Sequence, residues 1–154
     1  MTRKPEISTQ LFTAAESGQC SVLEGILAKK GIKVNAKEPT FGMTALHLAA
    51  SKGHKEAVDL LLENGSDIEA REDTGRTSLH AASFRGQLQV VEFLVAKGAK
   101  INAQTKDGKT PLDWAVLSQK SDVANFIREN GGKCGKDIST SPKAAAAAAA
   151  EAAV

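Results

Sequence analysis

Three histidines, His47, His54 and His80, carry the side chains best suited to proton transfer or metal binding near neutral pH. A histidine acts as a general base only within a constellation that includes a nucleophile or a carboxylate, and the sequence places no such constellation around any of the three. His47 and His80 also recur in one local pattern, T-x-L-H. A residue that recurs with the architecture is most simply structural, so we predict that the chain is not an enzyme.

The cysteines and a glycine cluster offer two further candidates for chemistry. Cys20 and Cys134 lie far apart, and the chain has neither a C-x-x-C nor an H-x-x-x-H pair, so we predict free thiols and neither a metal nor a cofactor. Residues 131–136 look like a phosphate-binding loop, but the glycine spacing is one residue short and Asp137 stands where a Ser or Thr should bind magnesium. We expect a helix terminator there.

The composition limits the classes of partner. The formal net charge of +2 over 154 residues is too small to indicate nucleic-acid binding. No stretch reaches the ~18 apolar residues of a membrane-spanning helix, and the N-terminal residues lack the apolar run of a signal peptide. We therefore expect one soluble domain, in the cytoplasm or the nucleus, with neither a nucleic-acid nor a membrane partner.

An internal repeat of 33 residues would position these side chains. Units begin at Gly42, Gly75 and Gly108, and T-x-L-H or T-P-L-D follows two residues later in each. A fixed period of this length indicates a repeat architecture, in which each unit packs on its neighbours.

Within one unit the residue types predict two helices and a turn. Thr44 stands at a helix N-cap, where its hydroxyl can accept a bond from a first-turn amide. Gly53, like Gly18 and Gly86, should end that short Ala-rich helix in a left-handed conformation. A second helix follows, with an inward apolar stripe of Ala57, Val58, Leu61 and Leu62. Residues 71–75 should then project as a finger resembling a β-hairpin.

These motifs resemble ankyrin repeats, and the resemblance covers residues 7–135. Thr44, Thr77 and Thr110 open the pattern in one register. The resemblance implies an all-α repeat solenoid, a stack of helix-turn-helix units joined by β-hairpin-like fingers, with atypical capping repeats at both ends. It implies that the T-x-L-H histidine joins the hydrogen bonds of the turn. It also implies a non-enzymatic module that binds one protein as an adaptor or inhibitor.

We divide the chain into an entry segment 1–8, a repeat domain 9–135, and a linker with an Ala-rich tail, 136–154. The units run over about 7–41, 42–74, 75–107 and 108–140, and the first carries extra residues near Lys30 and Phe41. The tail begins where the first helix of a fifth unit would begin. It is therefore either a docking helix that covers the fourth unit or a frayed end outside the fold, because an isolated helix of about a dozen residues is marginal.

Trp114 occupies the register position that Leu48 and Ala81 hold in the two preceding units. Because cores conserve volume more readily than identity, we predict that Trp114 packs in the core between repeats and that Ala81 makes room for it.

The resemblance also implies where a partner binds, because in such repeats the finger tips and the end of the first helix face the concave side. Carried onto this sequence, the partner-binding set is Phe41, Met43, Ser51, Lys52, Asp73, Arg76, Phe84, Arg85, Lys106, Lys109, Leu117 and Ser118. Phe84 and Arg85 are the strongest candidates, because an exposed ring beside an arginine matches the residue types enriched at binding hot spots.

The four predicted cations Lys52, Arg76, Lys106 and Lys109 would form a basic rim around an apolar strip. We therefore expect another protein with an acidic surface and an apolar anchor as the partner, and a monomer unless the chain sits in a complex. The alternative is a structural subunit, or a fragment of a larger complex, that docks through the C-terminal tail.

Overall fold

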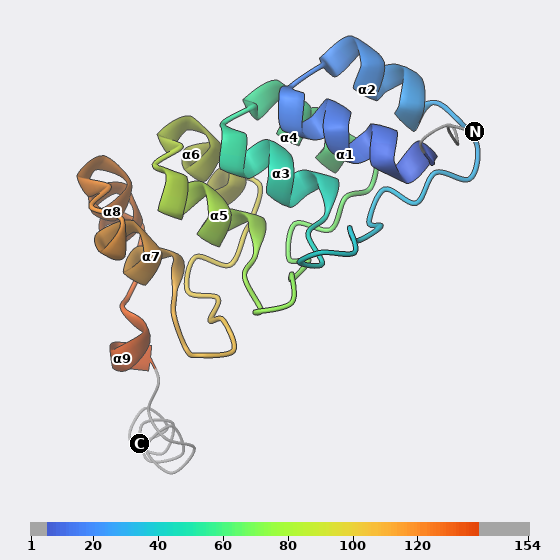
Figure 1. Cartoon of the computed structure of the whole chain (residues 1–154). Coiled ribbons are helices and arrows are strands. Elements are labelled where there is room, and N and C mark those ends of the chain that lie inside the picture. The colour runs from blue at the N-terminus through green and yellow to red at the C-terminus, as the bar shows by residue number, and fades with distance from the viewer. Residues whose placement is uncertain (1–5, 139–154) are drawn as a thin grey trace, which may run out of the picture.

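The computed structural model describes residues 6–138, and the regular elements within them are all helical. They are α1 (Ile7–Ser17), α2 (Cys20–Leu27), α3 (Ala45–Lys52), α4 (Lys55–Glu63), α5 (Ser78–Arg85), α6 (Leu88–Ala96), α7 (Pro111–Leu117), α8 (Ser121–Glu129) and α9 (Gly135–Ile138). Figure 1 shows the first eight as four stacked pairs, with α1, α3, α5 and α7 in a first row and α2, α4, α6 and α8 in a second row. The predicted all-α repeat solenoid is confirmed.

Threonine fixes the start of the first-row helices from the second unit onward. The Thr44 hydroxyl accepts a hydrogen bond from the His47 amide, and His47 Nδ1 accepts one from the Thr44 amide at 3.1 Å. Thr110 begins α7 in the same way, with Asp113 in place of the histidine and an N···Oδ2 distance of 3.0 Å. These reciprocal bonds satisfy amides that would otherwise lack a partner, so the predicted N-cap is confirmed.

Glycine ends three first-row helices for two reasons. Gly18, Gly53 and Gly86 have φ angles of 67°, 78° and 71°, in the left-handed region, as predicted. Each also leaves room for the following unit: a Cβ on Gly18 would lie 2.6 Å from the His54 ring, and one on Gly53 would lie 2.4 Å from the Gln87 side chain. The glycines therefore set both the turn and the close approach of neighbouring units.

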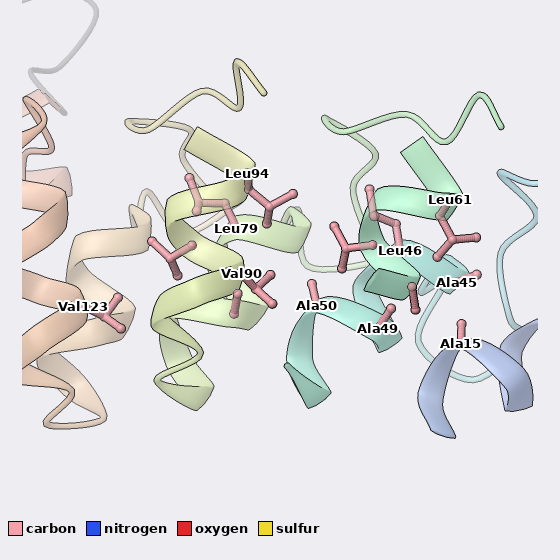
Figure 2. Close-up of a cluster of buried hydrophobic side chains, with 14 of the residues drawn as sticks. Ala15, Ala45, Leu46, Ala49, Ala50, Leu61, Leu79, Val90, Leu94 and Val123 are labelled. Atoms are coloured by element: carbon pink, nitrogen blue, oxygen red, sulfur yellow. The ribbon is translucent and has the colours of Figure 1, made fainter. Parts of the chain in front are cut away.

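The core lies between the two rows and continues from unit to unit. Figure 2 shows Leu46 and Leu61 of the second unit and Leu79 and Leu94 of the third, all at most 1% exposed. Burying one such side chain contributes about 2 kcal/mol. Small residues such as Ala49 line the first row, so that its helices pack closely. Most of the stability therefore arises between elements rather than within any one helix.

The fingers bond to one another as well as to their own units. The Asp73 amide donates to the Phe41 carbonyl oxygen at 2.9 Å, and the Lys106 amide donates to that of Thr74 at 3.0 Å. In the first finger the Glu38 amide donates to the Met43 carbonyl oxygen, five residues along the chain. In the second finger the Glu72 amide donates to the Arg76 carbonyl oxygen, four residues along. The extra residue predicted near Phe41 lies in this longer first finger.

The two ends of the stack depart from the repeat. Helix α1 begins at Ile7, within the segment predicted as the entry, and its N-cap residue makes no side-chain capping bond. At the other end, α9 is fastened to α7, because the Thr110 hydroxyl donates to the Lys133 carbonyl at 2.7 Å and the Gly135 amide donates to Asp113 at 2.7 Å. The Ala-rich tail, including its predicted docking helix, lies outside the described residues.

Candidate partner-binding groove

A groove of about 500 Å³ lies between α1, α3 and α5 of the first row and the first two fingers. Predicted partner-binding residues from two helices and two fingers line it together: Phe41, Met43, Ser51, Lys52, Arg76, Phe84 and Arg85. Phe41 and Phe84 are 57% and 39% exposed, whereas most large apolar side chains among residues 6–138 are buried or partly buried. The fold therefore leaves two aromatic rings open to solvent at one hollow surface.

Phe84, which lines this groove, forms an aromatic pair with Trp114 of the fourth unit. The rings of Phe84 and Trp114 meet edge to face, with centroids 5.6 Å apart. The Arg76 guanidinium lies 5.5 Å from the Trp114 centroid, and that of Arg85 lies 5.9 Å from the Phe84 centroid. Such contacts pre-order long side chains that otherwise lose conformational freedom on binding.

The prediction that Trp114 packs in the core between repeats is wrong. Its side chain is only partly buried, and its ring contacts are Phe84 and Arg76, on the side of the first row where Leu48 and Ala81 line the groove. Trp114 belongs neither to the core nor to the partly buried apolar residues packed against it, and Leu48 and Ala81 at the same register position line the groove. The indole Nε1 is buried without a hydrogen-bond partner in the described residues.

Glu72 holds the second finger in shape beneath the groove. This 4% exposed residue accepts hydrogen bonds from the Thr74 and Arg76 amides at 2.8 and 3.0 Å, and it pairs with the Arg76 guanidinium at 3.2 Å. Burial alone would raise the pKa of Glu72, but the hydrogen bonds from Thr74 and Arg76 outweigh burial and lower the pKa to about 2. The carboxylate is therefore ionised at neutral pH and positions Arg76 for contact with Trp114.

Most of the predicted basic rim is paired within the chain. Lys52 lies 3.8 Å from Glu16, and Lys109 lies 3.8 Å from Asp107, while Arg76 is held by its carboxylate. Arg85 is exposed and forms no ion pair with the described residues. Arg85 is thus the groove cation that a partner can pair with at least cost.

The structure places the other predicted residues away from this groove. Lys109 and Leu117 line a separate hollow of about 510 Å³ beside α7 and α9. Asp73 and Lys106 contribute backbone amides to the contacts between fingers, and the Ser118 hydroxyl donates to the Trp114 carbonyl at 2.8 Å. Seven predicted residues therefore line the groove, two line the second hollow, and Asp73, Lys106 and Ser118 line neither.

Several groove residues were missed from the sequence. Phe12 and Leu48 line the groove from the first-row helices, and Glu38 and Glu72 line it from the fingers. The Glu38 carboxylate accepts bonds from three amides of its own finger, much as Glu72 does. A glutamate just before the turn in the first two fingers could have indicated these residues. The pattern was not recognised because Thr105 holds the same position in the third finger.

The histidines are structural. Because His47 Nδ1 accepts from the Thr44 amide, its Nε2 carries the proton and donates to the Arg76 carbonyl at 2.9 Å. His80 repeats this arrangement, and His54 Nε2 lies 2.9 Å from the Glu16 carbonyl oxygen of the preceding unit. Burial lowers the pKa of His47 and lowers that of His80 to about 4. The hydrogen bonds to the carbonyl oxygens of Arg76 and Lys109 oppose this effect and raise the two pKa values. Both rings are neutral at pH 7 and have no free nitrogen.

Both thiols are free, as predicted. Burial, followed by the hydrogen bond and charge of Asp113, raises the pKa of the Cys134 thiol, which makes it a weaker nucleophile at neutral pH. No helix among residues 6–138 is both long and apolar enough to cross a membrane.

Comparison with known proteins gives partial matches to the repeat region of much longer chains. The zinc finger CCCH domain-containing protein 24 of Oryza sativa subsp. japonica is 41% identical over 73 residues, which are 46% of this chain and 10% of that protein. The E3 ubiquitin-protein ligase XBAT33 of Arabidopsis thaliana is 54% identical over 43 residues, 27% of this chain and 8% of the ligase. The NAD-capped RNA hydrolase NUDT12 of Pongo abelii is 42% identical over 66 residues, 43% and 14% of the two chains.

The chain thus spans at most 14% of these relatives, whose names describe unrelated activities. Two family models match the chain itself, one for ankyrin repeats in three copies over residues 11–105 and one for ankyrin repeats in many copies over residues 86–127. Ankyrin repeats are generally protein-protein interaction modules and typically have no catalytic role. With the paired helices, the threonine caps and the linked fingers, these matches show that the chain belongs to the ankyrin-repeat family.

Proposed function

We propose that the chain is a non-enzymatic adaptor or inhibitor that holds one protein partner in the groove between the first row and the fingers. The observation that carries this proposal is the exposed Phe84 ring, which lines that groove beside Arg76 and Arg85 and packs edge to face on Trp114. Exposed aromatic rings beside arginine are the side chains most often found at the energetic centre of protein interfaces.

The partner we propose presents an apolar side chain and a carboxylate close together. The apolar side chain packs on the edge-to-face rings, and the carboxylate pairs with Arg85, which has no competing ion pair among the described residues. A planar guanidinium already stacked on a ring can bind a carboxylate through two parallel hydrogen bonds. The groove is largely preformed, so binding costs little reorganisation of the backbone.

The locations that fit this proposal are the cytoplasm and the nucleus. The thiol of Cys134 is only partly buried, and Cys20 is also partly buried and free, which suits a reducing compartment.

Affinity purification of the full chain from its cell of origin tests the proposal. The double variant Phe84→Ala/Arg85→Ala removes the centre of the groove, and we expect it to retain less than about a tenth of the partner. Val22→Ala and Arg128→Ala serve as matched controls, because both side chains are exposed on second-row helices away from the groove. Both controls should capture the partner as the unmodified chain does.

Deletion of residues 139–154 separates the groove from the assembly role assigned to the tail. The groove proposal predicts unchanged capture by the shortened chain. Capture that survives the Phe84/Arg85 change but is lost on deletion would overturn the groove proposal in favour of docking through the tail.

A further inference from the structure

The two fingers beside the groove, residues 38–43 and 72–76, use all of their backbone amides internally. The Glu38 carboxylate accepts from three amides of the first finger, and the Glu72 carboxylate accepts from two of the second. The remaining amides donate to carbonyl oxygens of the fingers, and Pro39 has no amide proton. A partner segment added as a β-strand needs N–H and C=O groups that are free in alternation. These two fingers therefore offer no edge to such a strand.

The side chains along the groove are also poor partners for an extended backbone. Asparagine and glutamine, which carry a donor and an acceptor on one amide, are absent from the described residues that line it. The apolar lining comes from each helix in turn, with Phe12 on α1, Leu48 on α3 and Phe84 on α5. The backbone of an extended segment pressed onto these side chains would lose water without gaining a partner. A helix avoids this cost, because its peptide groups bond within the segment.

The spacing of this apolar lining suits a helix that runs along the row. Figure 1 shows α1, α3 and α5 as successive members of the first row, and neighbouring members contact one another. Helices packed in this way lie about 8–10 Å apart. Two turns of an α-helix rise about 11 Å, so apolar residues about seven positions apart meet successive members of the row. A helix of about three to four turns therefore spans the groove from α1 to α5.

The charges along the groove change sign from α1 to α5. The charged side chains that line it from α1 and the first finger are Glu16 and Glu38. Those from α3, the second finger and α5 carry a net positive charge, from Lys52, Arg76 and Arg85 against Glu72.

The ion pair between Glu16 and Lys52 leaves this polarity available to a partner. Its N···O distance is 3.8 Å, and both side chains are about half exposed, so the pair contributes little and Glu16 can exchange partners. An α-helix carries a partial positive charge at its N-terminus and a partial negative charge at its C-terminus. A helix in the groove is therefore most stable with its N-terminus near Glu16 and its C-terminus near Arg85.

We propose that the groove holds an amphipathic α-helix of the partner, with its N-terminus over α1 and its C-terminus over α5. This assignment rests on the proposed function and adds to it the form and the direction of the bound segment. The carboxylate that pairs with Arg85 lies near the C-terminal end of this helix. Its apolar stripe, at positions i, i+3, i+4 and i+7, faces Phe84, Leu48 and Phe12. A helix of this length is marginal in water, so the segment folds as it binds.

Selection of displayed peptides on the full chain tests the form of the bound segment. The probe is a phage library of random peptides of about 16 residues, long enough for the helix and its ends. Peptides whose affinity falls at least about tenfold with Phe84→Ala/Arg85→Ala occupy the groove. Synthetic copies of these peptides should gain helical circular dichroism in the far ultraviolet on binding.

The same selection separates failure of this proposal from failure of the proposed function. Groove-dependent peptides that bind without gaining helix overturn the helical form and leave the proposed function standing. Binders that are all insensitive to the Phe84/Arg85 change count against the proposed function itself.

Trp114 reports the direction of the bound helix. It is the only tryptophan of the chain, and its ring packs on Phe84 at the α5 end of the groove. Selected peptides without tryptophan carry a dansyl group at one terminus or the other. Energy transfer from Trp114 should be at least about twofold more efficient to the C-terminal label, because the helix ends lie about 16–20 Å apart. The reverse order would overturn the assigned direction.

Charge reversal tests the polarity independently. Glu16→Lys and Arg85→Glu should each weaken peptide binding about threefold or more at low ionic strength. The matched controls are Glu24→Lys and Arg128→Glu, exposed side chains on α2 and α8 in the second row, which should leave binding unchanged. Equal weakening by the controls would show that the net charge of the chain, rather than the polarity of the groove, governs binding, and would overturn the proposal.

Discussion

His80 Nε2 donates a hydrogen bond to the carbonyl oxygen of Lys109, 3.0 Å away, so a side chain of the third unit holds the finger that begins the fourth. His47 makes the equivalent bond to Arg76. In the fourth unit Asp113 takes the place of the histidine and accepts from the Gly135 amide instead. The side chain at this position therefore donates the bond between units in the second and third units, and accepts it from α9 in the fourth.

Acid should unfold the stack in a defined window. The pKa of His80 is lowered to about 4 in the folded chain. Its contribution to the free energy of unfolding is therefore complete above the pKa of about 6.5 in the unfolded chain, and it is lost as the pH falls towards 4. That loss is worth about 3 kcal/mol, and His47 adds a loss of the same sign. We expect urea midpoints to fall between about pH 7 and pH 4.5.

The substitution His80→Gln provides the control for this acid effect. The variant is less stable at neutral pH, but its midpoint should depend less on pH over the same range. Glu72, whose pKa is lowered to about 2, extends the loss below pH 4.5. Equal midpoints for the unmodified chain at about pH 7 and about pH 5 would contradict the assignment of neutral, buried histidines.

Glu69→Asn should stabilise the chain. Asn35 and Asn102 each donate to a glycine carbonyl of the next unit and accept from a backbone amide there. Glu69 stands in the same register and accepts from the Lys100 amide at 2.7 Å, but it has no proton to donate, and its Oε2 is buried without a partner in the described residues. Asparagine would restore the second bond, and we expect a gain of about 1 kcal/mol in the free energy of unfolding.

The reverse substitution, Asn102→Glu, is the matched control and should lower that free energy by a similar amount. Urea titrations at neutral pH measure both changes. A less stable Glu69→Asn variant would show that the longer glutamate side chain is itself required for the approach of the two units.

Gln119→Gly should also stabilise the chain. Gln119 holds φ of 60° at the position of Gly53 and Gly86, and it is the one residue other than glycine with positive φ among residues 6–138. The left-handed conformation costs about 1–2 kcal/mol, and glycine loses about 0.5–1 kcal/mol through its greater freedom when unfolded, so the net gain is about 0.5–1 kcal/mol. Thermal unfolding measures this gain. In that assay Asn125→Gly, at an exposed site inside α8, should be destabilising.

Leu61→Ala should cost about 2–5 kcal/mol, because its side chain is fully buried. In a stack held by contacts between neighbours, this loss should uncouple the second and third units rather than stay local. Chemical denaturation read through Trp114, which lies in the fourth unit, measures how far the effect spreads. Val22→Ala, at an exposed position, should stay within about 0.5 kcal/mol, and an unchanged midpoint for Leu61→Ala would contradict the shared core.

The sequence predicts best the parts of the fold that recur. Thr44 and Gly53 were assigned correctly because their roles are local, a cap and a left-handed turn, and because each has counterparts 33 residues away. Trp114 was misplaced because volume alone does not distinguish a core position from a partly exposed one. Whether such a position is buried depends on which side chains of the neighbouring units cover it, and therefore on how the units stack.

The groove shows the same limit. Phe84 and Arg85 stood out because they do not recur, but the contacts of Trp114 with Phe84 and Arg76 depend on distances between two units. The ion pairs of Lys52 and Lys109 also went unforeseen. Whether a surface cation is free or paired depends on side-chain geometry, which a spacing pattern does not contain.

The recurring left-handed glycines and the histidine bonds give the two central units equivalent contacts with their neighbours. Residues 42–74 and 75–107 present the same cap, the same left-handed glycine and the same bond to the following finger. A second copy of residues 75–107 inserted after Asp107 would meet on each side a surface built like the one it already touches. A gene for such a protein can therefore lengthen by tandem duplication in steps of one unit, with each step adding binding surface and requiring no new core to evolve.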